Sequence, residues 1–271
     1  MSDKIALTDV KLKYASIQEA KTLSGLRLIL GANTVPGPWR EACKGMFYVK
    51  GIPYTPVASA GHDGSSRELV EWTAQTSAPV AIWNDERPRS TWIEQLYLAE
   101  RLQPEPALIP ANADDRVLML GLINEIAGEN GLGWQRRHLL IEGNVSNPAA
   151  DQRTKDFWHR FGGKYLFNEE AAAAAPARVA SILKFLAERL DRQKAKGSKF
   201  FIGDKLSAVD IYWATFAALL RPMPPELCPM ATSFREMYTE KNPLIEAATA
   251  PSLMEHRAFI YSEYLELPLI F

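Results

Sequence analysis

The pattern of apolar and polar positions changes character near residue 103. Upstream of it, short apolar runs at 26–31 and 52–57 have the length and composition of buried strands. Between them we expect a helix from about Pro38, which suits a first-turn position, to Gly51. The two prolines of the second run place that strand at the edge of a sheet. These elements predict a βαβ unit.

The same part of the chain continues with further helix and strand signals. Residues 67–75 predict a short helix, and the run 76–83 places a proline just before a third strand. A turn follows, after which a short strand is present or lost. Ser90 and Thr91 then precede a helix that extends to about residue 102. The resulting order, β-α-β-α-β-α, is that of a thioredoxin-like domain.

Downstream of this region the apolar periodicity is helical throughout. Helices are expected at 114–129, at 148–160 with Asn147 as its cap, and at 177–192, whose apolar residues form one stripe. Ser207 and Asp210 have the spacing of a capping box ahead of an apolar run, which predicts another helix. The second part of the chain is therefore predicted to be all-helical.

The stretch Phe-Ile-Gly-Asp-Lys-Leu-Ser-Ala-Val-Asp at 201–210 is more specific than a helix start. It resembles the Gly-Asp-x-x-Ser/Thr-x-x-Asp segment that opens the central helix of the C-terminal domain in glutathione transferases. Lys-Gly-Ile-Pro-Tyr at 50–54 and Tyr-Leu-Ala-Glu-Arg-Leu at 97–102 are further local matches. The resemblance covers roughly residues 26–220, with both halves in the family's order.

This resemblance implies an α/β plus all-α fold. A thioredoxin-like glutathione-binding domain is expected at 26–103 and a helical C-terminal domain at 104–271. Residues 1–25 form an N-terminal extension without a strong pattern: an extra strand, a surface helix or a partly ordered arm. The tail from residue 258 is expected to pack back on the body of the protein.

Composition excludes several classes of function. With 31 basic and 32 acidic residues, the chain offers no electrostatic case for binding nucleic acid or an anionic membrane. No apolar run approaches the roughly 18 residues of a membrane span, and the N-terminus lacks the apolar core of a signal peptide. Two distant cysteines form no disulfide framework, and the four histidines show no metal-ligand spacing. We therefore expect a cytoplasmic protein without a metal.

The resemblance implies a first site for the backbone of glutathione. In the family, a cis proline before the third strand turns the preceding residue outward to pair with the ligand. Pro79 matches this proline, and Ala78 would be the pairing residue. The alternative is an ordinary trans proline that opens an edge strand.

A second site for glutathione is implied at the start of the following helix. There the family uses an acid followed by Ser, together with helix amides, to hold the γ-glutamyl end. Thr91 keeps the hydroxyl, but Ser90 replaces the usual Glu or Gln. The alternative is that Ser90 or Thr91 only caps the helix.

The positions at which the family places the residue that activates the glutathione thiol hold different residue types in this sequence. The family uses Tyr, Ser or Cys, but the corresponding positions here hold Gly37 and Trp39. The nearest donors are Asn33 and Thr34, which we predict as catalytic residues, although both are also ordinary turn residues. Trp39 is expected to form a wall of the glutathione site or part of the core. Cys43 lies on an apolar helix face and is expected to be a buried structural thiol.

Other candidate residues carry weaker signals. Trp134 is predicted to line the pocket for a second substrate, or else to close a helical kink. The neighbouring pair Arg136 and Arg137 is expected on a solvated face. His62 falls in a loop where some family members place a basic residue that contacts the ligand.

The resemblance favours a glutathione transferase-like enzyme that takes glutathione as co-substrate and adds its thiolate to a small, unidentified electrophile. One alternative is a non-catalytic binding or chaperone-like protein of the same fold, which the missing activating residue favours. Another is a glutathione-dependent ether-cleaving enzyme or isomerase, which would use the same first site. A homodimer is expected from the family.

Overall fold

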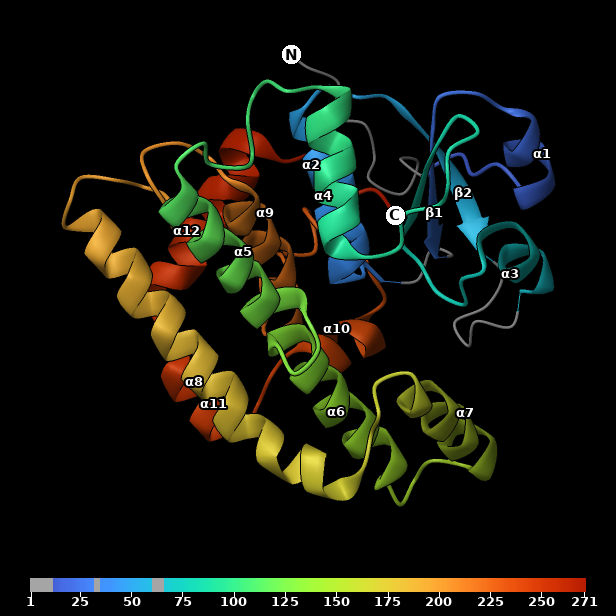
Figure 1. Ribbon diagram of the computed structural model, residues 1–271. Helices are drawn as coiled ribbons and strands as arrows, with labels where there is room; N and C mark the ends of the chain where they lie inside the picture. The colour runs from blue at the N-terminus through green and yellow to red at the C-terminus, as the bar shows by residue number, and fades with distance from the viewer. Residues whose placement is uncertain (1–11, 32–34, 60–65) are drawn as a thin grey trace, which may run out of the picture. The chain divides into compact units, whose positions relative to one another are not determined.

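The computed structural model describes residues 12–31, 35–59 and 66–271, and the chain falls into two compact units (Figure 1). Unit 1 comprises Met1–Pro106, Pro222–Glu236 and Tyr261–Phe271, and unit 2 comprises Ala107–Arg221 and Met237–Ile260. Unit 1 contains the sheet, and unit 2 is helical.

Among its described residues, unit 1 has a sheet of three strands in the order β2-β1-β3. β1 (Leu26–Gly31) pairs in parallel with β2 (Tyr54–Ser59) and antiparallel with β3 (Val80–Trp83). β2 is an edge strand, as its prolines predicted. After β3, where the sequence allows a further short strand, the chain forms only an isolated bridge between Ala81 and Arg89.

Four helices cover the two faces of this sheet (Figure 1). They are α1 (Ile17–Thr22), α2 (Pro38–Val49), α3 (Arg67–Thr73) and α4 (Trp92–Leu102). α1 and α3 lie on one side, where their apolar residues form a core with alternate strand residues. α2 and α4 lie on the other side. The described part of the N-terminal extension therefore contains a helix, α1, and one isolated bridge, between Ala15 and Val57 of β2.

The C-terminal tail belongs to unit 1. The Leu269 amide donates to the Leu227 carbonyl at 2.8 Å, and the Lys44 ammonium donates to the Ile270 carbonyl at 2.5 Å. Leu265 and Leu269 are buried. The prediction that the tail packs back is confirmed.

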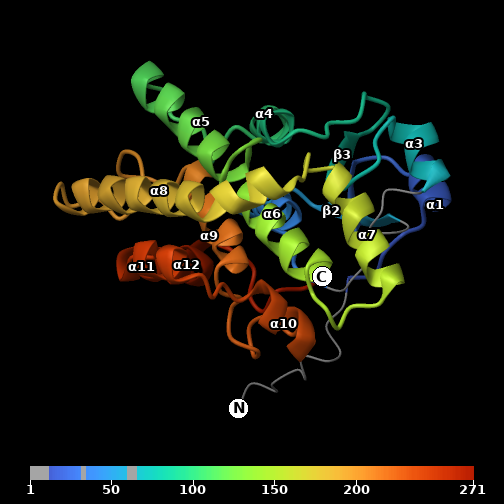
Figure 2. The same ribbon diagram turned by 90° about the horizontal axis from the view of Figure 1, so that it is seen from below.

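Unit 2 is built around the long helix α8 (Glu169–Lys194), which packs against α6 (Leu132–Val145) and α11 (Pro243–Ala248) (Figures 1 and 2). α5 (Ala113–Ala127) packs against α9 (Ala208–Phe216), and α7 (Gln152–Gly163) against α6. A 3₁₀ turn at Ala217–Leu219 continues α9. The helices α10 (Thr232–Tyr238) and α12 (Pro251–Tyr264) each contain residues of both units.

Every residue of α9 is buried, and the capping box predicted at its start is formed. The Asp210 carboxylate accepts from the Ser207 amide and hydroxyl, each at 2.9 Å. It also accepts from the Phe201 amide at 2.9 Å and lies 3.0 Å from His256 Nε2. One wholly buried carboxylate thus joins α9, the loop before it and α12.

Two predicted helix starts are wrong. α7 begins at Gln152 with Asp151 as its cap, because the Asn147 side chain instead accepts from the Ala149 amide in a turn. α8 begins at Glu169, well before residue 177, with Asn168 as its cap. The alanines at 171–175 are part of this helix, since alanine has the highest helix propensity.

The prediction of a solvated face at Arg136 and Arg137 is also wrong, since both side chains are buried. Arg136 pairs with Glu240 and donates to the Leu219 carbonyl at 2.9 Å. Burial outweighs the attraction of Glu240 and lowers the pKa of Arg136 to about 10. Arg137 donates to the Tyr238 hydroxyl at 2.9 Å. Such partners are what make a buried guanidinium tolerable.

None of the helices in residues 12–31, 35–59 and 66–271 has the length and apolar character that crossing a membrane requires.

Candidate functional site

The turn before β3 has the geometry that was predicted for it. The Ala78–Pro79 peptide bond is cis. Ala78 is half-buried, and its amide and carbonyl make no hydrogen bond with another described residue. Its backbone is therefore available, within the described structure, to pair with a peptide.

The buried side chain of Gln95 connects this turn to the start of α4. Its amide nitrogen donates to the Pro79 carbonyl at 3.0 Å and to the Arg89 carbonyl at 3.3 Å. Arg89 is in turn held to β3 by two hydrogen bonds with Ala81, each 2.9 Å long. The two segments predicted to bind glutathione, at Pro79 and at residues 90–91, are thus held together by one side chain.

Thr91 is the N-cap of α4, as the sequence predicted. Its hydroxyl accepts from the Glu94 amide at 3.4 Å, and the Glu94 carboxylate reaches back to form a capping box. The acceptor for the Ser90 and Thr91 amides is a single atom, Glu94 Oε2. It accepts from the Ser90 amide at 3.3 Å, the Thr91 amide at 3.2 Å and the Thr91 hydroxyl at 2.9 Å.

The other oxygen of Glu94 accepts from Arg87 Nη1 at 2.6 Å. Partial burial alone would raise the pKa of Glu94, but the hydrogen bonds from Arg87 and Thr91 lower it to about 2. At neutral pH the start of α4 therefore carries a fixed carboxylate. Because it uses the donors that a ligand carboxylate would need, this turn is not an empty anion site.

At the start of α2, the side chain of Arg40 occupies the space beside Gly37. A Cβ built on Gly37 would lie 2.6 Å from Arg40 Nε. Arg40 itself donates to the Val35 carbonyl at 2.6 Å. Trp39 is half-buried in the first turn of the same helix. The predicted catalytic residues, Asn33 and Thr34, lie outside the described residues, as does His62.

Cys43 faces the core of unit 1 and is fully buried. Burial raises the pKa of its thiol, against a smaller opposing effect of Lys44. The prediction of a structural thiol is therefore confirmed. Cys228 is also buried.

Trp134 lies in the first turn of α6 and is half-buried. Its ring packs edge-on against Tyr165, with centroids 5.0 Å apart. Tyr165 also contacts Phe161 of α7, at 5.2 Å between centroids. One turn along α6, the Arg137 guanidinium lies over the Phe161 ring at 5.9 Å. Trp134 is therefore one edge of an aromatic cluster in unit 2, and its role towards a second substrate stays a prediction.

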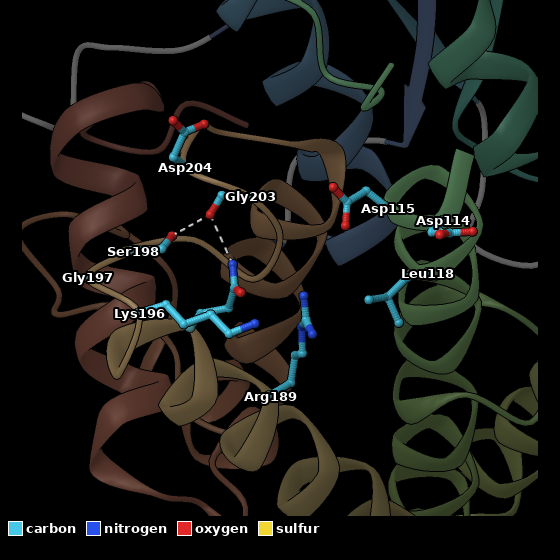
Figure 3. A pocket seen from close by; sticks show the side chains of 10 residues that line it. Asp114, Asp115, Leu118, Arg189, Lys196, Gly197, Ser198, Gly203 and Asp204 are labelled. Carbon is cyan, nitrogen blue, oxygen red and sulfur yellow. Dashed lines mark hydrogen bonds between the residues drawn. The ribbon is translucent and has the colours of Figure 1, made fainter. Parts of the chain in front are cut away.

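A separate cavity of about 460 Å³ lies wholly within unit 2, between the start of α5 and the end of α8 (Figure 3). The side chains of Arg189 and Asp115 face it from opposite walls. The Gly203 carbonyl in its lining accepts from Gln193 Nε2 at 3.0 Å and from the Ser198 hydroxyl at 2.6 Å. Arg189 Nε donates to the Phe201 carbonyl at 2.8 Å. These bonds fix the connection between α8 and α9, which accounts for much of the polar lining.

Across the described ranges, no three His, Cys, Asp or Glu side chains come close enough together to hold a metal ion. Two residues that organise the candidate site were missed from the sequence, Glu94 and Gln95. The Thr-x-x-Glu spacing from Thr91 is a capping-box signature and could have identified Glu94. No sequence signal links Gln95 to Pro79.

Comparison with known proteins supports the fold. Residues 169–256 match the family model of the glutathione S-transferase C-terminal domain. The sequence has no match among curated proteins.

Several solved structures resemble most of the chain. One is a glutathione transferase family member from Pseudomonas fluorescens with two glutathione molecules bound (12% identity, 91% of this chain and 94% of that chain, TM-score 0.60). Another is a glutathione S-transferase from Methylobacterium radiotolerans in complex with glutathione sulfonate (16% identity, 89% and 92%, TM-score 0.58). A third is the beta-etherase LigF from a Sphingobium species (17% identity, 86% and 99%, TM-score 0.55). At such identities these likenesses establish the fold: a thioredoxin-like region followed by an all-helical C-terminal domain.

Proposed function

We propose that the chain is a member of the glutathione transferase superfamily, which its fold and the match of residues 169–256 support, and that it binds glutathione on unit 1 and adds its thiolate to a small electrophile. The cysteinyl backbone of glutathione would pair with Ala78. Its γ-glutamyl end would lie at Ser90 and Thr91, with Trp39 as a wall of the site.

The observation that carries this proposal is the open backbone of Ala78, which Gln95 holds beside the first turn of α4. A peptide ligand needs an unpaired amide and carbonyl on an exposed edge, and a second group that fixes its end. Unit 1 offers the first at Ala78, and the second lies at Ser90 and Thr91, whose donors Glu94 holds until its side chain moves aside. The side chain of Gln95 is buried, which restricts its rotation.

Activation of the thiol is assigned to Asn33 or Thr34. Lowering the pKa of a thiol by about two units requires roughly 2.7 kcal/mol, and one hydrogen bond to a charged group contributes about 1.5–3 kcal/mol. A single donor in the stretch that precedes α2 in the sequence would therefore suffice. The electrophile would be held on unit 2, with Trp134 as one side of its pocket.

The proposal is tested by retention of the full-length protein on immobilised glutathione, followed by calorimetry. Binding at millimolar glutathione is expected, and no binding there would remove every glutathione-dependent function. Turnover would then be measured with an aryl halide and with an aryl ether, which separates thiolate addition from ether cleavage. Turnover and glutathione binding would also be measured for Asn33→Ala and Thr34→Ala. The variant that removes the donor is expected to lose turnover and to retain binding. Unchanged rates in both variants would discard the assigned donor.

The second candidate is a non-catalytic binding or chaperone-like protein of the same fold. Two observations favour it: Glu94 already uses the donors at the start of α4, and Arg40 fills the space beside Gly37. Binding of glutathione without turnover of any electrophile would support this candidate. A homodimer is a further expectation, which light scattering on the purified protein would test.

A further inference from the structure

We propose that Glu94 is a built-in competitor of the ligand: its carboxylate takes the place that the γ-glutamyl carboxylate would occupy, and it weakens binding of any ligand with a carboxylate at that end. This inference rests on the proposed function, since it concerns the same site. It makes Glu94 a specificity-determining residue.

The geometry shows which donors are used. Glu94 Oε2 receives the amides of Ser90 and Thr91 and the hydroxyl of Thr91, at 3.3, 3.2 and 2.9 Å. A backbone amide has one hydrogen, so each of these two amides has one strong partner at a time. A ligand carboxylate can reach them only after the Glu94 side chain rotates away.

The negative charge of Glu94 adds to its competition with a ligand carboxylate. The start of a helix favours one negative charge, and Glu94 already supplies it within the first turn of α4. A second carboxylate at the same place would be repelled by the first. Arg87 does not relieve this repulsion, because it is paired with the other oxygen of Glu94 at 2.6 Å. Removing the Glu94 carboxylate would free two amides, one hydroxyl and one guanidinium together.

Unit 1 contains a matched control for the capping function alone. At the start of α1, Glu19 Oε2 accepts from the Ser16 amide and hydroxyl, each at 2.8 Å, in the same type of capping box. Glu19 has no part in the proposed site. Glu19→Ala therefore controls for the general effect of losing a capping carboxylate in unit 1, whereas Glu94→Gln, which keeps a capping acceptor, controls for the cap of α4 itself.

The test is calorimetric titration of the full-length protein with reduced glutathione. Glu94→Ala is expected to bind about tenfold more tightly than the unchanged protein, because hydrogen bonds to a charged group become available to the ligand. Glu19→Ala is expected to bind as the unchanged protein does. Glu94→Gln keeps a capping acceptor and removes only the charge, so it should give a smaller gain and serves if the alanine variant folds poorly.

Titration with a second peptide distinguishes the effect of the ligand's α-carboxylate on binding from the effect of the rest of the peptide. The tripeptide 4-aminobutanoyl-cysteinyl-glycine is glutathione without its α-carboxylate, and Glu94→Ala should not improve its binding. Equal gains for both peptides, a gain in Glu19→Ala, or no gain in Glu94→Ala would each overturn the inference while the proposed function stands. If neither the unchanged protein nor Glu94→Ala binds glutathione at millimolar concentration, the proposed function and the inference fall together.

Discussion

The Lys50 ammonium lies 2.6 Å from the Glu100 carboxylate, and the side chain of Lys50 is wholly buried. The same ammonium donates to the carbonyls of Gln103 at 2.8 Å, Pro104 at 3.3 Å and Pro106 at 2.9 Å. One cation thus joins the end of α2 to the end of α4 and to the extended segment that follows it. A buried charge of this kind is tolerated only because its partners are all in place.

Replacement of Lys50 is therefore expected to destabilise unit 1 strongly. Lys50→Met removes the charge and leaves the carbonyls unsatisfied, and we expect a loss of about 3 kcal/mol in the free energy of unfolding. Urea denaturation monitored by circular dichroism measures this loss. Arg67→Ala is the control, because the Arg67–Glu71 pair is solvent-exposed and should contribute almost nothing. Equal effects of the two variants would contradict the role given to Lys50.

In unit 2, a comparable loss is expected for Asp210→Ala. The substitution removes the acceptor of four hydrogen bonds in a fully buried position, from Phe201, His256 and twice from Ser207. We expect a cost of about 3 kcal/mol, seen as a lower urea midpoint. Asp151→Ala, which removes the exposed cap of α7, should cost much less. If the two variants lost similar stability, burial would not explain the importance of Asp210.

Several strands and one helix cap could be predicted from the sequence, because the residues that determine them are close together along the chain. The strands at 26–31 and 80–83, the edge position of β2 and the cap at Thr91 all follow from neighbouring residues. The start of α8 was predicted too late, although its cap, Asn168, is a local signal, because the alanines before Pro176 carry no amphipathic pattern and proline normally interrupts a helix.

The burial of Arg136 and Arg137 could not be predicted from the sequence, for a different reason. Arg136 and Arg137 appear as a polar face, and the groups that pair with them, Glu240 and Tyr238, lie far away along the chain. The candidate site shows the same limit. Thr91 could be identified as a cap from its neighbours, but the contact of Gln95 with Pro79 exists only in the folded sheet.

Neither cysteine should react in the native protein. Burial raises the pKa of the Cys43 thiol, and the thiolate is the reactive form. We expect negligible labelling by a maleimide under native conditions and labelling of both Cys43 and Cys228 in guanidinium chloride, read by peptide mass spectrometry. Tyr48→Cys places a thiol at an exposed position of the same helix and should be labelled rapidly. If Cys43 were labelled as fast as the Tyr48→Cys control, its thiol would be accessible and it would be a candidate nucleophile.

The last prediction concerns the acid stability that Glu94 provides. Hydrogen bonds from Arg87 and Thr91 overcome the effect of partial burial and hold the pKa of Glu94 at about 2, below its ordinary value of 4.5. The folded state thus binds fewer protons than the unfolded state between these values, so stability falls as the pH falls. The contribution is fully present above pH 4.5 and is lost progressively towards pH 2.

We expect the unfolding free energies of the unchanged protein and Glu94→Gln to differ by a constant amount from pH 7 to pH 5. Below pH 4.5 the difference should shrink, because the unchanged protein then loses the charge that the variant never had. Arg87→Ala should raise the pKa of Glu94 and move this loss to higher pH, since it removes the largest attractive partner. A difference that stays constant down to pH 2.5 would show that the Glu94 charge is not what stabilises the start of α4.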